Sequence, residues 1–267
     1  MGMMNLQQVI DFICQSVPQA RLVGDGATPV ARVHTDTRTL QPGDLFVALK
    51  GERFDANAFL ADARDAGAVA AVAHGGLEAA GLPGIEVPDS LAALGALATA
   101  WRAQFSLPLI GITGSNGKTT VTQMVASILR AWKGDAAFAT QGNFNNDVGV
   151  PKTLFRLAPE HEIAVVEMGA SHPGDIKKLV EYVEPTCGMI TNVGRAHLQG
   201  FGSFEGVKKT KGELYDFLAA SDALVFINAD NEHLMEMADQ RNINRLITYG
   251  KEDSCDVWGE VISCAPF

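Results

Sequence analysis

The segment of clearest chemical meaning is a glycine-rich run between an apolar stretch and an amphipathic helical pattern. It reads Gly-Ile-Thr-Gly-Ser-Asn-Gly-Lys-Thr-Thr over residues 111–120. Glycines allow backbone N–H groups to turn toward a phosphate, and the start of the following helix adds a positive end. The run therefore predicts a phosphate-binding loop, in which Lys118 neutralises the β- and γ-phosphates and the Thr119 hydroxyl reaches Mg²⁺.

This loop departs from the strict phosphate-binding pattern at one position, because Ile112 stands where the pattern has glycine. An ordinary glycine-rich turn between a strand and a helix is the alternative, but Gly-Lys-Thr-Thr in this context favours a nucleotide loop. The residues expected to bind the nucleotide are Gly114, Ser115, Asn116, Gly117, Lys118, Thr119 and Thr120.

Three other side chains could serve a magnesium site. Glu167 ends the apolar run 163–166, so its carboxylate would face the phosphate loop across the strand ends. A solvated glutamate at a strand end has the same pattern. His197 and Lys211 follow later in the chain, and position alone does not separate a functional role for either from a structural or surface one.

Polar side chains gather in two further stretches. Residues 142–151 hold an amide cluster that includes Asn145 and Asn146. Amides can bridge phosphates and carboxylates without adding charge, but Asn and Gly also favour tight turns, so both interpretations stay open. The run Asp36-Thr37-Arg38 precedes a short apolar run that contains Phe46, and its composition alone indicates a loop.

These residues need a scaffold, and from residue 107 the sequence alternates between apolar strand-like runs and helical patterns. Continuous β-branched runs joined by helices predict a parallel sheet buried on both faces. Ligands of such sheets bind beyond the carboxyl ends of the strands. The helix after the loop carries apolar residues on one face: Val121, Met124, Val125, Ile128, Leu129 and Trp132. The expected strands are 107–112, 163–168, 187–193, 223–227 and 246–249.

The predicted organisation is α/β with two domains. Residues 1–88 form a small mixed α/β domain, 89–106 a connecting helix, and 107–267 a central domain with a phosphate loop and a mostly parallel, helix-flanked sheet. The strand-like pattern at 256–262 has no closing element after it. We therefore expect the central domain to be truncated.

Composition excludes several classes of protein. The chain has 267 residues, with 21 Lys and Arg against 31 Asp and Glu, a net charge of −10 that disfavours a nucleic-acid or anionic-membrane binder. The four cysteines have no spacing typical of zinc or disulfide scaffolds. The N-terminus lacks the basic start of a secretion signal, and the longest apolar stretch, 91–101, is too short to span a bilayer. The expected location is the cytoplasm.

Taken together, these motifs resemble the Mur ligases, which build the peptide stem of bacterial peptidoglycan and so serve cell-wall formation, cell shape and division. Residues 111–120 are similar to the family's ATP loop, and segments 36–38, 42–48 and 51–55 to the uridine-nucleotide domain of its later members. Segments 142–151, 167–175 and 196–203 are similar to the members that add a dipeptide to the stem.

The resemblance implies an ATP- and Mg²⁺-dependent amide ligase that acts through an acyl phosphate. Its substrates would be UDP-N-acetylmuramoyl tripeptide and D-alanyl-D-alanine, without nucleic-acid or membrane partners, and the chain would be a monomer. The catalytic residues it implies are Lys118, His197 and Lys211. Thr119, Glu167, His197 and a carbamylated Lys211 would bind metal, Asn231 would flank the adenine, and the substrate would contact Asp36, Thr37, Arg38, Phe46, Asn145 and Asn146.

Three alternatives compete with this interpretation. One is the family member that adds the third stem residue to the dipeptide nucleotide, which the amide cluster 142–151 disfavours. Another is a non-catalytic nucleotide-binding module, since a third domain typical of the family has no counterpart in this sequence. An unrelated GTPase is disfavoured because the sequence has no Asn-Lys-x-Asp motif. We expect this chain to bind the uridine nucleotide, to bind ATP weakly, and to turn over poorly or not at all.

Overall fold

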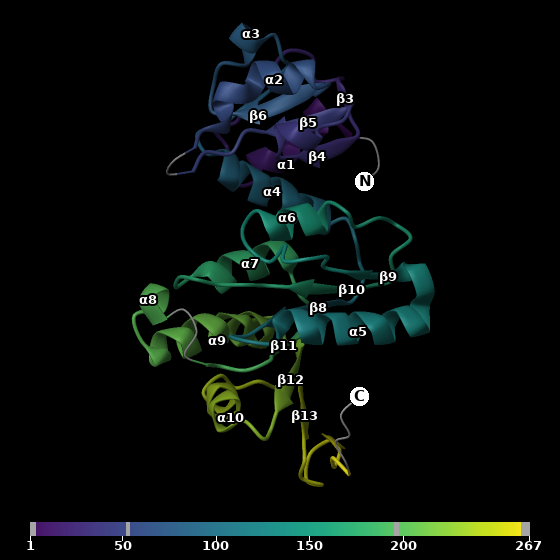
Figure 1. Ribbon diagram of the computed structural model, residues 1–267, viewed down its shortest axis with the longest axis vertical. Coiled ribbons are helices and arrows are strands. Elements are labelled where there is room, and N and C mark those ends of the chain that lie inside the picture. The colour runs from purple at the N-terminus through teal and green to yellow at the C-terminus, as the bar shows by residue number, and fades with distance from the viewer. Residues whose placement is uncertain (1–3, 52–53, 195–197, 263–267) are drawn as a thin grey trace. The chain divides into compact units, whose positions relative to one another are not determined.

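The computed structural model describes residues 4–51, 54–194 and 198–262. The chain divides into two compact units (Figure 1). Unit 1 contains residues up to Ser106 together with Asp147–Glu160, and unit 2 contains Leu107–Asn146 and the residues from His161 onward. Each unit has its own sheet and its own buried core.

Unit 1 is built on a five-stranded sheet of order β2-β7-β6-β5-β4, in which only β2 runs antiparallel to its neighbour. Strands β1 and β3 form a separate two-stranded antiparallel sheet. The strands are β1 Met4–Asn5, β2 Arg21–Val23, β3 Pro29–Val30, β4 Arg32–His34, β5 Asp44–Val47, β6 Ala70–Ala73 and β7 Gly84–Glu86. The helices are α1 Leu6–Cys14, η1 Thr37–Thr39, η2 Ala56–Phe59, α2 Leu60–Asp65, α3 Leu77–Ala80, α4 Ser90–Arg102 and α6 Gly149–Leu154.

Helix α4 was expected to connect two domains, but the structure places it inside unit 1. Asp89 caps it by accepting hydrogen bonds from the backbone of Leu91 and Ala92. Its Ala- and Leu-rich surface is buried on most sides, so it acts as a core helix of this unit. Residues 147–160 also depart from the predicted boundaries, because they return to unit 1, where Trp101 Nε1 donates to the carbonyl of Leu157 at 3.3 Å.

Unit 2 contains a seven-stranded sheet of order β14-β13-β12-β11-β8-β10-β9, and every pair in it is parallel. The predicted α/β class, with a helix-flanked parallel sheet, is therefore confirmed. The strands are β8 Leu109–Thr113, β9 Ala137–Ala139, β10 Ile163–Glu167, β11 Cys187–Ile190, β12 Leu224–Asn228, β13 Leu246–Gly250 and β14 Val257–Trp258. The helices are α5 Lys118–Lys133, η3 Gly134–Ala136, α7 Asp175–Val183, α8 Leu198–Phe201, α9 Phe204–Ala220 and α10 Glu232–Asp239.

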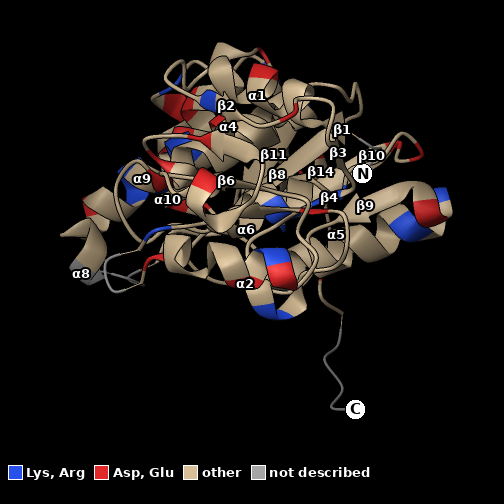
Figure 2. Cartoon of the chain, turned by 90° about the horizontal axis from the view of Figure 1, so that it is seen from above, with Lys and Arg blue, Asp and Glu red and all other residues tan. Residues whose placement is uncertain are grey.

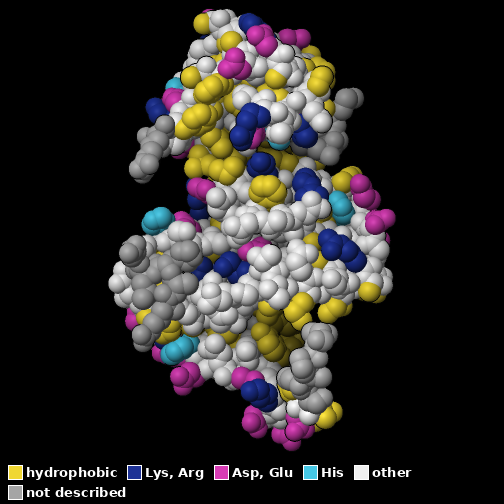
Figure 3. Space-filling view, viewed as in Figure 1, with side chains coloured by type: hydrophobic (Ala, Val, Ile, Leu, Met, Phe, Trp, Pro, Cys, Tyr) yellow, Lys and Arg dark blue, Asp and Glu magenta, His cyan; other side chains and the backbone are white. Residues whose placement is uncertain are grey.

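Helix α5 forms where the periodicity predicts it, but its apolar side is not all core. Leu129 is buried, whereas Met124, Ile128 and Trp132 are 62%, 69% and 67% exposed. The helix contacts the sheet through a face shifted to one side of the apolar one, next to Ile112 and other core residues of β8, β9 and β10. Figure 3 shows hydrophobic side chains at the surface over β11 and β12 beside this helix.

The two faces of the seven-stranded sheet are covered unequally. In β11 and β12 the residues of one face are buried, while Met189 and Phe226 on the other face are only partly buried. Helix α9 covers the first face, where Leu218 lies against Gly188. On the second face, α5 contacts β8, β9 and β10, and Met189 of β11 lies at the edge of the same core cluster.

The charged residues are spread over both units. In the view of Figure 2, basic and acidic segments are interspersed along the chain. Helix α2 carries Asp62, Arg64 and Asp65, whereas α5 carries basic residues and no acidic one. Among the described residues, no helix combines the length and apolar character needed to cross a bilayer.

Candidate functional site

The glycine-rich loop 114–117, which the sequence predicts to bind phosphate and which we call the phosphate loop, lies between β8 and α5. Gly117 immediately precedes the helix with a φ of +74°, and Gly114 has a φ of +147°. Both values lie in the region that favours glycine. A side chain at position 114 would also collide with Thr191, so a loop of this shape needs glycine there.

The loop is held by residues after β11, the strand next to β8. The backbone N–H groups of Ser115 and Asn116 donate to the carbonyl and to Oδ1 of Asn192, each at 3.0 Å. Thr191 Oγ1 donates to the Asn116 carbonyl at 2.7 Å. The backbone N–H of Asn116 is therefore already used inside the loop. No local sequence pattern identifies Thr191 or Asn192 as supports of this loop.

The N–H groups that stay available for an anion are those at the start of α5. The first N–H groups of a helix have no partner within it, and they carry the positive end of the helix dipole. Val121 is the first residue here whose N–H closes a helical bond, to Gly117. Thr119 and Thr120 are exposed in this first turn, so the Thr119 hydroxyl is open to solvent.

Lys118 lies folded back over the loop. Its Nζ donates to the carbonyls of Gly114 at 2.9 Å and Ser115 at 3.4 Å. Burial lowers the pKa of Lys118, and the negative charge of Glu167 opposes that effect. The ammonium thus lies at the loop and within the electrostatic influence of Glu167, and its role toward a phosphate stays a prediction.

Glu167 is the last residue of β10 and pairs with Ile112 of β8 in register. Its side chain is buried, with the residue only 1% exposed. Oε1 accepts a hydrogen bond from Asn145 Nδ2 at 2.7 Å, whereas Oε2 is buried and has no hydrogen-bond partner among the described residues. A buried carboxylate oxygen without a partner suits a hard cation such as Mg²⁺.

The described residues hold no cluster of three His, Cys, Asp or Glu side chains that would bind a metal on its own. Mg²⁺ usually takes one or two protein carboxylates and completes its shell with phosphate oxygens and water. Glu167 and the Thr119 hydroxyl fit that donor set. His197, the other predicted ligand, lies outside the described residues.

Lys211 belongs to α9 and is 2% exposed. Its Nζ lies 5.6 Å from the centroid of the Phe201 ring. Burial, helped by the nearby charge of Lys118, lowers the pKa of Lys211 to about 8. A large fraction of a buried amine with this pKa is neutral near pH 8, and a neutral amine is the form that reacts with CO₂.

The predicted amide residues lie in different surroundings. Asn145 bonds Glu167 as described, and its neighbour Asn146 is exposed. Asn231 caps α10, since its side chain accepts from the backbone N–H groups of His233 and Leu234. The roles predicted for Asn146 and Asn231 toward ligands stay predictions.

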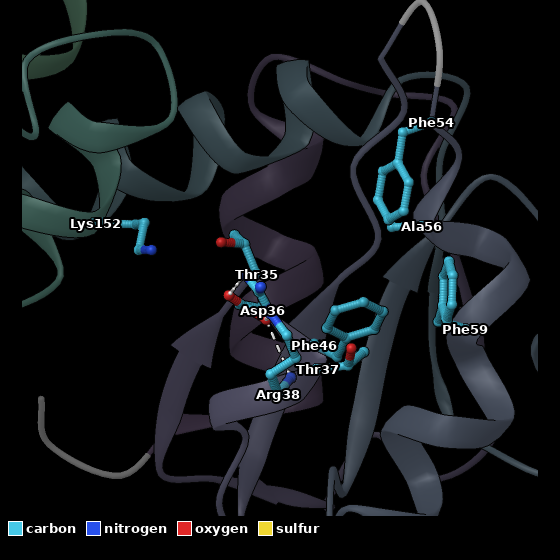
Figure 4. A pocket seen from close by; sticks show the side chains of 9 residues that line it. All are labelled: Thr35, Asp36, Thr37, Arg38, Phe46, Phe54, Ala56, Phe59 and Lys152. Carbon is cyan, nitrogen blue, oxygen red and sulfur yellow. Dashed lines mark hydrogen bonds and ion pairs between the residues drawn. The ribbon is translucent and has the colours of Figure 1, made fainter.

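Unit 1 contains a cavity of about 570 Å³ (Figure 4). The predicted residues Asp36, Thr37, Arg38 and Phe46 line it, together with Thr35, Phe54, Ala56, Phe59 and Lys152. Lys152 comes from α6 and lies across from the phenylalanines in Figure 4. No local sequence pattern predicts Lys152 at this cavity, because residues 147–160 return to unit 1 from a distant part of the chain.

The polar side of the cavity is a paired set of charges. Arg38 Nε and Nη2 donate to the two carboxylate oxygens of Asp36 at 2.9 and 2.7 Å. This pairing holds the pKa of Asp36 far below its usual range. Asp36 also caps η1 through the backbone N–H of Arg38. The Arg38 side chain is 85% exposed, so it is accessible to a ligand.

The apolar side of the cavity is aromatic. Phe54 and Phe59 are stacked with ring centroids 5.5 Å apart and planes 22° from parallel. Phe54 is 58% exposed, whereas Phe46 is fully buried. Aromatic faces beside a basic group suit a ligand that has both a planar ring and phosphates.

Comparison with known families gives two matches. Residues 112–266 match the Mur ligase middle domain, and residues 29–102 match the Mur ligase family, catalytic domain.

The similar curated proteins are named UDP-N-acetylmuramoyl-tripeptide–D-alanyl-D-alanine ligase. The protein from Haemophilus influenzae is 44% identical over 81% of this chain and 48% of its own length. The protein from Escherichia coli is 43% identical over 85% of this chain and 48% of its own length. The chain thus spans about half the length of the curated relatives it matches.

Solved structures with a similar fold include MurF from Acinetobacter baumannii, with a TM-score of 0.84 and 33% identity over 93% of this chain and 54% of that one. MurF from Thermotoga maritima in complex with ADP has a TM-score of 0.74 and 31% identity, over 84% of this chain and 51% of that one.

Proposed function

This chain belongs to the Mur ligase family, and from that premise we propose that it provides the nucleotide-binding and substrate-binding parts of an ATP-dependent amide ligase. The reaction is addition of D-alanyl-D-alanine to UDP-N-acetylmuramoyl tripeptide, a late step in peptidoglycan precursor synthesis. The curated relatives named for this reaction are 44% and 43% identical to the chain, which supports the assignment.

The observation that carries the proposal is the group of charged residues in unit 2. Lys118 begins the helix after the phosphate loop, Glu167 ends the strand paired with β8, and Lys211 is buried close enough for the charge of Lys118 to lower its pKa. These are the groups needed to bring a triphosphate and a carboxylate together. A related MurF was solved with ADP, which supports a nucleotide at this loop.

In the proposed reaction a carboxylate oxygen of the tripeptide attacks the γ-phosphorus of ATP, and ADP leaves. The amine of the dipeptide then attacks the acyl carbon, and phosphate leaves. Lys118 and the N–H groups at the start of α5 hold the phosphates during the first step. Bound Mg²⁺ would neutralise phosphate charge, with Glu167 and Thr119 as its protein ligands and Lys211, if carbamylated, as a further acidic ligand.

The cavity of unit 1 is proposed to bind the uridine nucleotide. Arg38 and Lys152 supply positive charge for a diphosphate, and the Phe54–Phe59 pair supplies an aromatic surface for the base. Asp36 orients Arg38 through their two hydrogen bonds. We place this chemistry in the cytoplasm, where ATP is available, and expect a monomer.

The ligase that adds diaminopimelate to the dipeptide nucleotide is the nearest rival function. Its solved structure is 19% identical with a TM-score of 0.60, a likeness that concerns the fold alone. Peptide length separates the two functions, because they take nucleotides that differ by one stem residue.

A calorimetric titration tests the proposal. The chain should bind UDP-N-acetylmuramoyl tripeptide more tightly than the dipeptide nucleotide, and Mg²⁺-ATP more tightly than ATP in EDTA. Preference for the dipeptide nucleotide would transfer the assignment to the rival ligase. A folded chain that binds ATP but neither uridine nucleotide would contradict the proposed substrate.

A further inference from the structure

Asn145 contacts Glu167 from a segment 22 residues earlier in the chain. Its side-chain nitrogen has two N–H groups, and both have acceptors. Nδ2 lies 2.7 Å from Glu167 Oε1 and 2.7 Å from Asn143 Oδ1. An amide with both donors satisfied has one orientation, so it offers no free donor to a substrate.

The backbone of Gly169 packs against Asn145 from a second direction. The N–H of Gly169 donates to the Asn145 carbonyl at 2.7 Å. A Cβ at position 169 would lie only 2.8 Å from Asn145 Oδ1 and 2.9 Å from its Cγ. Residue 169 must therefore be glycine for the Asn145 side chain to lie where it does.

This arrangement has a direct consequence for the carboxylate. With Oε1 held by Asn145, the plane of the Glu167 carboxylate cannot rotate freely, and the buried Oε2 is the oxygen left without a partner. A neutral donor fixes an acidic ligand without competing for the cation as a lysine or arginine would. Hydrogen bonds of this kind commonly orient metal ligands.

We infer that Asn145 is a positioning residue that holds the Glu167 carboxylate with Oε2 presented to the Mg²⁺ of the bound nucleotide, and that Gly169 makes room for it. The inference rests on the proposed function, because it assumes Mg²⁺-ATP at the phosphate loop. The direct substrate contact that the family resemblance implies for Asn145 is a separate prediction.

The test measures how much Mg²⁺ strengthens ATP binding. Calorimetry with ATP in Mg²⁺ and with ATP in EDTA gives two Kd values for each variant, and their ratio is the Mg²⁺ enhancement. In Asn145→Ala we expect the enhancement to fall by roughly 10-fold or more, the usual effect of losing a partner of a metal ligand. The Kd for ATP in EDTA should stay within about 2-fold of the wild-type value, since the phosphate loop is untouched.

Two further variants act on the same contact without changing Asn145. Gly169→Ala displaces the side chain and should lower the enhancement in the same direction. Asn143→Ala removes one restraint at an exposed position, so it should fold normally and lower the enhancement by a smaller factor. Gln123→Ala is the matched control, because its amide contacts the carbonyl of Thr140 and not Glu167, and it should leave the enhancement unchanged.

The outcomes separate the inference from the function on which it rests. An unchanged enhancement in Asn145→Ala and Asn143→Ala would overturn the positioning role. An equal loss of ATP affinity with and without Mg²⁺ would also overturn it, because it would indicate a structural effect on the loop. If the wild-type chain itself shows no Mg²⁺ enhancement, the proposed magnesium site fails, and the inference fails with it.

Discussion

The cavity of unit 1 and the phosphate loop of unit 2 both gather charged side chains, but in different surroundings. Asp36 and Arg38 lie at the surface and satisfy each other with two hydrogen bonds. Glu167 and Lys211 are 1% and 2% exposed. The Glu167 carboxylate keeps one oxygen without a partner among the described residues.

This difference shows what each region is built to do. An exposed ion pair contributes little to stability and can exchange its partner for a ligand phosphate at little cost. A buried ionisable group with incomplete partners destabilises the fold, so its presence in a core marks a place where chemistry is done. The contrast predicts that substitutions of the exposed Asp36–Arg38 pair change binding alone, whereas substitution of the buried Lys211 trades function for stability.

The largest effect is expected for Lys118→Ala. Removing the ammonium takes away a charged hydrogen bond to the phosphates, worth about 1.5–3 kcal/mol, so the Kd for Mg²⁺-ATP should rise by roughly 10- to 100-fold. The Kd for the uridine nucleotide should not change, because its cavity is lined by residues of unit 1. Calorimetry with each nucleotide on one preparation measures both values.

Lys133→Ala is the matched control for that substitution. Lys133 ends the same helix, is paired with Glu162 at 2.7 Å, and lies far from the phosphate loop along the helix. It should leave both Kd values unchanged. If Lys118→Ala binds Mg²⁺-ATP as tightly as the control, the loop does not hold the triphosphate, and the contrast between the two regions loses its basis.

The sequence predicts the local parts of this site well. A strand, a glycine turn and an amphipathic helix follow one another directly at residues 109–133, so the phosphate loop and Lys118 can be identified from neighbouring residues. Glu167 is also predictable, because a residue at the end of a parallel strand lies at the ligand-binding edge of the sheet. Strand order places β10 beside β8 and so brings it to the loop.

Contacts between distant segments could not be predicted in this way. The support of Asn116 by Asn192 joins residues 76 positions apart, and Asn145 reaches Glu167 only because the segment after β9 folds back onto the end of β10. The same holds for Lys152, which joins the cavity after an excursion of the chain through unit 2. For α5, periodicity gives the apolar face but not how much of the sheet is covered, so Ile128 and Trp132 are exposed.

A second prediction concerns stability, with a smaller effect. Lys211 has a pKa of about 8 in the folded chain against an ordinary value of 10.5. Between these pH values the unfolded chain binds a proton that the folded chain has lost, so wild-type stability should rise with pH across this window, by up to about 3 kcal/mol. Lys211→Met removes this penalty and should raise the free energy of unfolding near pH 7 by about 2 kcal/mol.

Urea unfolding at several pH values in bicarbonate-free buffer measures the stability gain of Lys211→Met over wild type. This gain should shrink between pH 8 and pH 10.5. Lys209→Met on the same helix is the control, since Lys209 is exposed and its replacement should leave the pH dependence of stability unchanged. If Lys211→Met proves less stable than wild type at pH 7, the buried amine is not a destabilising group, and the contrast with the exposed pair of unit 1 would be wrong.

The smallest effect on folding is expected for Arg38→Ala. Its guanidinium is 85% exposed and bonds only a partly exposed carboxylate, so thermal unfolding should be nearly unchanged. Loss of the same group should raise the Kd for the uridine nucleotide by roughly 10-fold, the usual effect of removing one charged contact to phosphate. Arg21→Ala is the matched control, because Arg21 is also exposed, pairs with Glu86 at 2.6 Å, and does not line the cavity. An Arg38→Ala variant that unfolds at a lower temperature but keeps its affinity would make the Asp36–Arg38 pair a structural feature, and the two regions would then differ in burial alone. Weaker nucleotide binding with an unchanged unfolding temperature would show that Arg38 exchanges Asp36 for a ligand phosphate, as the exposure of Arg38 predicts.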